Sequence, residues 1–145
     1  MTMTLWIVAF LAFSLPADYR LEHQHSEPVS RDIFSARHEF RAWSAPGGQT
    51  LTLSAWMPMA LRDGGPMVEA GRWPVRVGGR ELEVVETSLF MGVPQQAFVL
   101  YFQHESGSAV LAGRGYTRAG FEALLQQSGI DFVPAPPDNA PGALP

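Results

Sequence analysis

The alternation of apolar and polar residues is most regular between Trp73 and Ile130. Residues 75–77 and residues 82–84 each alternate between apolar and polar side chains, and Gly78-Gly79 lies between the two segments. Both central residues of a tight hairpin turn take positive φ angles, which glycine adopts without steric cost. The pattern therefore predicts an antiparallel β-hairpin.

Two more hairpins are predicted from the same kind of pattern. Residues 96–112 contain two apolar segments joined by His104-Glu105-Ser106-Gly107, and residues 40–56 contain two joined by Ala45-Pro46-Gly47-Gly48. Serine, proline and glycine are typical of turns for backbone reasons. The Met57–Gly71 stretch, rich in proline and glycine, is expected to be an irregular loop.

One helix is expected after the last of these strands. Thr117 can cap its first turn, and Phe121, Leu124 and Leu125 form one apolar stripe at helical spacing. Gly129 is placed to end the helix in a left-handed conformation. The pattern predicts a helix that packs against the sheet.

The N-terminal residues 1–17 carry no charged side chain. The apolar run from Leu5 to Ala17 is short for a membrane-spanning helix, which needs roughly twenty residues, and has the length of a signal-peptide core. We expect an apolar helix here, with three alternatives: a cleaved signal, a retained helix that contacts the membrane, or a helix buried in the domain. Trp6, Phe10 and Phe13 are the contact residues expected of the retained helix.

The rest of the chain divides by composition. Residues 18–37 are polar and lack sustained periodicity, and Pro28 excludes a continuous helix, so we expect an arm or linker. Residues 38–133 form the expected α+β domain, and residues 134–145 a proline-rich tail. The expected fold is an antiparallel sheet of about five to seven strands with one C-terminal helix packed on it, plus the N-terminal apolar helix.

Composition excludes several kinds of function. The net charge of −4 argues against nucleic-acid binding, which requires a clustered basic face. The chain has no cysteine, which excludes disulfides, thiolate metal sites and cysteine nucleophiles. Residues 104–107 contain residue types that hydrolases use, but their position favours a turn. No sequence motif supplies a nucleophile, a base and an orienting group together, so we expect no enzyme and no cofactor.

A metal site is the competing hypothesis. His23 and His25 are two residues apart, so their imidazoles would share one face of a strand. Met57, Met59 and Met67 provide thioethers, which suit copper(I). A solvent-exposed arm and a flexible core filler are the alternative interpretations of these histidines and methionines.

Aromatic residues give the clearest indication of a partner. The segment from Phe98 to Phe102 is apolar on both faces, which is typical of a strand covered twice or of one that lies against a partner. Trp56 and Tyr101 are therefore expected to contact a partner or a membrane.

The order hairpin, hairpin and short helix in VRVGGRELEVVE, AFVLYF, SAVLAGRG and TRAGFEALLQQSG resembles small extracytoplasmic accessory domains of bacteria. These are the C-terminal domains of membrane-bound anti-sigma factors and the related Mog1/PsbP-like units. The resemblance lies in layout, covers residues 75–129 and implies a binding or assembly module.

We therefore expect a non-catalytic accessory subunit on the periplasmic or extracytoplasmic side of a bacterial membrane. It would bind partner proteins of a membrane complex and contact the membrane through residues 1–17. The alternative is a periplasmic copper- or zinc-binding protein that uses His23, His25 and the loop from Met57 to Met67.

Overall fold

The computed structural model describes residues 2–31, 34–57, 67–90 and 92–134. Within these ranges, the side chains of residues 27–31, 34–36 and 67 are not described. The expected proline-rich tail, apart from Pro134, lies outside the described residues, and so does most of the expected loop after Met57.

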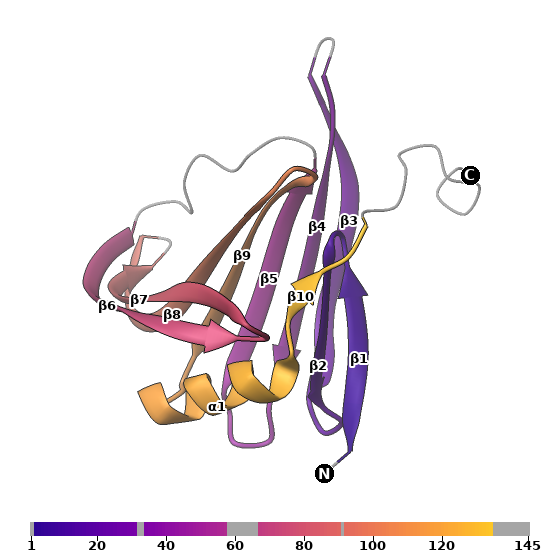
Figure 1. Cartoon of the computed structure of the whole chain (residues 1–145). Helices are drawn as coiled ribbons and strands as arrows, with labels where there is room; N and C mark the ends of the chain where they lie inside the picture. The colour runs from indigo at the N-terminus through magenta and orange to yellow at the C-terminus, as the bar shows by residue number, and fades with distance from the viewer. Residues whose placement is uncertain (1, 32–33, 58–66, 91, 135–145) are drawn as a thin grey trace.

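Two antiparallel sheets and one helix make up the described part of the chain (Figure 1). The large sheet has the order β3-β4-β5-β9-β8-β7-β6, and the small sheet has the order β1-β2-β10. The strands of the large sheet are β3 (Arg20–Arg31), β4 (Phe34–Ser44), β5 (Thr50–Met57), β6 (Met67–Val77), β7 (Arg80–Phe90), β8 (Val93–His104) and β9 (Gly107–Arg114). The remaining elements are β1 (Met3–Val8), β2 (Leu11–Pro16), α1 (Arg118–Ser128) and β10 (Asp131–Phe132).

The expectation of an antiparallel α+β fold with one C-terminal helix is confirmed. All three predicted hairpins are present, as β4–β5, β6–β7 and β8–β9. Gly78 and Gly79 have φ angles of 59° and 77°, as a tight turn between Val77 and Arg80 requires. The expected number of strands was too low, because ten strands are found in the described residues alone.

The helix begins and ends where its sequence indicates. The Thr117 hydroxyl accepts a hydrogen bond from the Gly120 N–H at 3.0 Å, and Gly129 has the left-handed φ of 57°. Phe121, Leu124 and Leu125 are buried on one side of α1. They join the core between α1 and the inner face of the large sheet.

The expected N-terminal helix is wrong. Residues 3–16 form the β1–β2 hairpin, with Val8 opposite Leu11 and Met3 opposite Pro16. Leu11, Phe13 and Leu15 of β2 are buried, whereas Ala12 and Ser14 between them are partly exposed, which is the period of a half-buried strand. The segment is apolar on both faces, and for this reason its alternation is hard to see in the sequence.

The expected polar arm also belongs to the large sheet. Residues 18–37 contain β3 and the beginning of β4, which pair along their length. Pro28 fits in β3 because β3 is the end strand of the sheet, and an end strand has one edge without a ladder. The polar composition follows from this edge position.

The core lies between the inner face of the large sheet and a second layer made by α1 and the β1–β2 hairpin (Figure 1). Trp43 of β4 is at its centre and is almost fully buried. The rings of Trp6 and Phe13 meet Trp43 edge-on, at centroid distances of 5.4 and 5.6 Å. A hydrogen bond of 2.7 Å between the hydroxyls of Tyr19 and Tyr116 links the end of the hairpin to the beginning of α1.

Gly107 closes the β8–β9 hairpin against β5. A Cβ added to Gly107 would lie 2.0 Å from the backbone oxygen of Trp56, and the φ of Gly107 is 148°. Replacement of Gly107 by alanine should therefore lower the free energy of unfolding by about 3 kcal/mol, measured by urea denaturation. Gly79→Ala is the control, because Gly79 also has a positive φ but no atom within 4 Å of an added Cβ; we expect a cost of about 1 kcal/mol. Equal costs for the two variants would contradict the close approach.

The Tyr19–Tyr116 pair predicts a loss of stability in alkaline solution. Burial raises the pKa of both hydroxyls above the ordinary value of 10.0. The folded state then keeps protons that the unfolded state loses, so the free energy of unfolding should be constant up to about pH 9.5 and fall as the pH rises beyond 10. The chain contains neither lysine nor cysteine, so few other side chains titrate there. Urea denaturation at pH 8, 10 and 11 should show a weaker fall for Tyr19→Phe/Tyr116→Phe; the same fall in both proteins would contradict the assignment.

Candidate functional site

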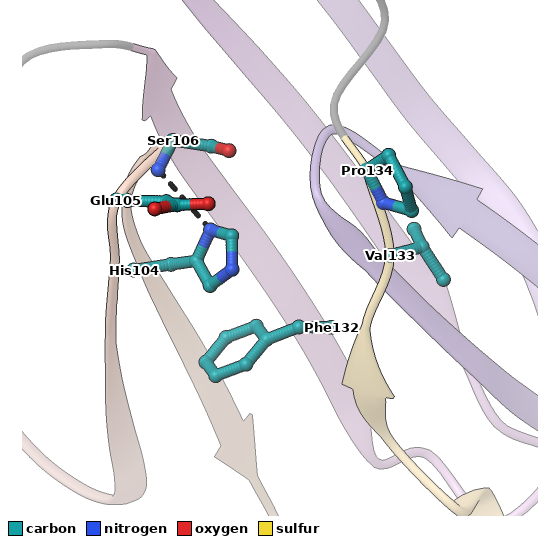
Figure 2. A pocket seen from close by; sticks show the side chains of 6 residues that line it. All are labelled: His104, Glu105, Ser106, Phe132, Val133 and Pro134. Atoms are coloured by element: carbon teal, nitrogen blue, oxygen red, sulfur yellow. Dashed lines mark hydrogen bonds between the residues drawn. The ribbon is translucent and has the colours of Figure 1, made fainter.

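A hollow with a volume of about 410 Å³ lies between the tip of the β8–β9 hairpin and the chain at β10 (Figure 2). It is lined by His104, Glu105, Ser106, Phe132, Val133 and Pro134. The first three residues come from the predicted turn, and the last three from β10 and the residues after it. The fold thus brings together two segments that are distant in the sequence.

The polar groups of this hollow are arranged as in a turn. The Nδ1 atom of His104 accepts a hydrogen bond of 3.1 Å from the backbone N–H of Ser106. This lone pair of His104 therefore serves the backbone and is not directed at the Ser106 hydroxyl (Figure 2). A serine nucleophile needs a base at its hydroxyl and a third group that orients the base. The geometry supports the turn interpretation of residues 104–107.

Aromatic contacts fix the positions of His104 and Phe132, which line the hollow. The His104 ring stacks on Phe10 at 5.4 Å and lies against Phe132 at 4.5 Å. The Arg80 guanidinium lies 4.1 Å from the Phe132 ring centre and pairs with Asp131 at 3.0 Å. These contacts tie β10 to β7 and β8. They therefore hold the small sheet against the large sheet.

The residues of the expected metal site lie on opposite faces of the large sheet. Met57 is buried in the core, on the inner face. His25 lies near His38, and His38 stacks on Trp56 at 4.5 Å. Neighbouring residues of a strand face opposite sides, so Trp56 and Met57 point away from each other.

His23 is exposed on β3, and Met59 lies outside the described residues. Among the described residues, no group of three or more histidine, aspartate or glutamate side chains is placed to hold a metal ion. Of the expected ligands that the structure describes, Met57 therefore lies apart from His23 and His25.

Trp56 and Tyr101, expected at a partner surface, both lie on the outer face of the large sheet and are partly exposed. Trp56 stacks on His38 with an interplanar angle of 17°. Tyr101 packs against a small cluster of buried residues on the same face, namely Ala97, Val99, Val110 and Ala112. The strand β8 is thus apolar on both faces, as its sequence indicates, and both faces are packed.

The N-terminal contact residues have a different position from the one expected. Phe10 and Phe13 are buried in the core, and Trp6 is partly buried against Trp43. The large apolar residues that are exposed on this hairpin are Leu5 and Ile7, with exposed fractions of 64% and 63%. Strand alternation explains the difference, because Trp6 and Val8 point inward and their neighbours point outward.

Leu5 and Ile7 belong to a larger surface that sequence reasoning missed. Met3, Leu5 and Ile7 of β1 lie opposite Pro16, Ser14 and Ala12 of β2. We define the hairpin outer face as Met3, Leu5, Ile7, Ala12 and Ser14. It carries no charged side chain, and next to it Asp131 of β10 lies opposite Ala12 and pairs with Arg80. The sequence signal for this face is the period of two within residues 3–15. It is hard to see because both faces of the hairpin are apolar.

Comparisons of the chain with protein-family models, with curated proteins and with solved structures found no match in any of the three. The resemblance of residues 75–129 to bacterial extracytoplasmic accessory domains therefore stays a prediction. In the part of the chain that the structure describes, no helix is both long enough and apolar enough to span a bilayer.

Proposed function

We propose that this chain is a non-catalytic accessory subunit that binds a partner protein of a complex at a bacterial membrane through the hairpin outer face. The observation that carries the proposal is the exposure of Leu5 and Ile7, side by side on an uncharged surface. Large apolar side chains grouped on a surface and bordered by polar groups are typical of protein interaction sites.

The energetics favour such a role. Full burial of a leucine or isoleucine side chain stabilises a complex by about 1.5–3 kcal/mol, and nearly two thirds of each side chain is available. In protein interfaces a few central, fully buried residues carry most of the binding energy. The side chains are also held on a strand that packs on the core, so little conformational freedom is lost on binding.

Residues 1–17 were expected to contact the membrane through Trp6, Phe10 and Phe13, whereas the proposed contact is with a protein and uses other side chains of the same segment. Phe10 and Phe13 stabilise the fold, and Leu5 and Ile7 would make the contact. The histidine and methionine arrangement gives no comparable support to the metal-binding alternative, because Met57 and His25 face opposite sides of the sheet.

The proposal predicts that charge on the hairpin outer face abolishes partner binding. The variant Leu5→Glu/Ile7→Glu should capture at least tenfold less partner protein from solubilised native membranes than the wild-type chain does. The reason is that burial of two unpaired glutamates at the interface is very unfavourable. Val68→Glu/Val93→Glu is the matched control. Val68 and Val93 are 51% and 53% exposed and lie on the large sheet, so this variant carries the same added charge elsewhere.

Circular dichroism should show that both variants keep the native fold, because all four positions are exposed. Equal capture by the two variants would contradict the proposal. A second arm uses protein-free phospholipid vesicles in a flotation assay. If the wild type floats with the vesicles and Leu5→Glu/Ile7→Glu does not, the face binds lipid, and the protein-partner proposal is wrong.

A further inference from the structure

The two sheets end in four edge strands, namely β3 and β6 in the large sheet and β1 and β10 in the small sheet. A free edge presents unpaired backbone N–H and C=O groups, which readily pair with another strand. Proteins protect such edges with proline, with charged side chains or by keeping the strand short. The four edges can be compared in these terms.

Three of the four edges are protected. Strand β3 contains Pro28, and strand β6 contains Pro74. Both strands also carry several charged residues, and β10 has only two residues, one of which is Asp131. Pairing of another chain with any of these edges would lose hydrogen bonds or leave charges poorly solvated.

Strand β1 has none of these protecting features. Its sequence, MTLWIV, contains no proline and no charge, and it is six residues long. In Figure 1, β1 lies at the outside of the small sheet, and within the described residues no strand pairs with its outer edge. Two of the four large apolar side chains that are exposed among the described residues, Leu5 and Ile7, also belong to this strand.

The hairpin register determines which backbone groups of β1 are available. The Ala17 N–H donates to the Thr2 carbonyl at 2.9 Å, so Thr2 and Ala17 form a hydrogen-bonded pair. In an antiparallel ladder, hydrogen-bonded and non-hydrogen-bonded pairs alternate. Thr4 and Trp6 therefore direct their peptide groups at β2, and Leu5 and Ile7 direct theirs at the outer edge.

We propose that β1 pairs in an antiparallel manner with β1 of a second copy of this chain. The two-fold axis passes through Leu5, so that Leu5 lies opposite Leu5 of the other copy and Met3 lies opposite Ile7. This register places outward-directed peptide groups opposite each other at all three odd-numbered positions. It joins the two small sheets into one continuous sheet.

A second copy fits this edge for two reasons. An uncharged strand can lie antiparallel to itself without placing like charges opposite each other, which would be unfavourable. A two-fold axis also makes the interface self-complementary, because each copy offers the same donors and acceptors. The outward side chains of both strands are on one face, so Leu5 and its copy contact each other there.

This inference goes beyond the proposed function, because the backbone edge of β1 forms the contact between the two copies, and Leu5 is the residue of the hairpin outer face nearest the two-fold axis. Dimerisation would place two hairpin outer faces side by side on one continuous sheet. A partner protein would then meet a surface twice as large.

Single cysteines test the register directly, because the native chain has no cysteine. The Cα atoms of a hydrogen-bonded antiparallel pair are about 5.5 Å apart, within the roughly 4.4–6.8 Å that a disulfide bridges. Leu5→Cys should therefore form a covalent dimer under mild oxidation. Ile7→Cys is the matched control, equally exposed, but its two copies would lie about 13 Å apart along the strands.

We expect at least tenfold more covalent dimer with Leu5→Cys than with Ile7→Cys. A mixture of Met3→Cys and Ile7→Cys should form a heterodimer as readily as Leu5→Cys forms its homodimer. Similar yields for the two single variants would show random collision and overturn the proposed register.

Sedimentation velocity of the wild-type chain provides the second measurement. The wild type should be a dimer that Leu5→Glu converts to a monomer, because two glutamates would face each other on the axis. A monomeric wild type would overturn this inference. If the wild type is monomeric but Leu5→Glu/Ile7→Glu still loses partner capture and its control does not, the dimer is wrong and the proposed function is still supported. The failure of the dimer is therefore distinguishable from the failure of the proposed function.

Discussion

The packing of the N-terminal hairpin on Trp43 is the contact on which the rest of the structure depends. A sheet must bury its apolar face against a second layer, and α1 covers only part of the large sheet. Trp6 and Phe13 cover Trp43 from one side, and Leu11 and Leu15 continue the same layer. Residues 3–16 therefore form part of the core, although their composition is typical of a signal or membrane segment.

The packing of the hairpin on Trp43 also explains which residues of β1 are exposed. In a strand, each residue that points inward places its neighbour outside, so the burial of Trp6 and Val8 directs Leu5 and Ile7 outward. The hairpin register then leaves the peptide groups of Leu5 and Ile7 at the free edge of β1. Face and edge are two consequences of one packing arrangement. They differ in what they can bind, since the face offers side chains and the edge offers backbone hydrogen bonds.

Local sequence signals predicted the elements that depend on local chemistry. Gly78-Gly79 identified a turn, and Thr117 and Gly129 identified both ends of α1. The first hairpin lacks such a signal, because its turn contains Ala9, a residue that rarely has the positive φ of 56° found here. The sequence alone does not show that Met57 and His25 lie on opposite faces, because this depends on how β3, β4 and β5 pair. The hollow at His104 likewise requires β10, which a long segment separates from the β8–β9 turn.

Nuclear Overhauser effects between the two halves of residues 3–16 test the central claim most directly. In the hairpin, Leu5 and Ser14, and Ile7 and Ala12, are non-hydrogen-bonded partners whose Cα atoms are about 4.5 Å apart. Strong Hα–Hα contacts are expected for both pairs, together with contacts from the Phe13 and Trp6 rings to Trp43. A continuous series of contacts between residues three positions apart, from Leu5 to Leu15, would show a helix. That result would contradict the fold of the hairpin, its outer face and the proposed dimer.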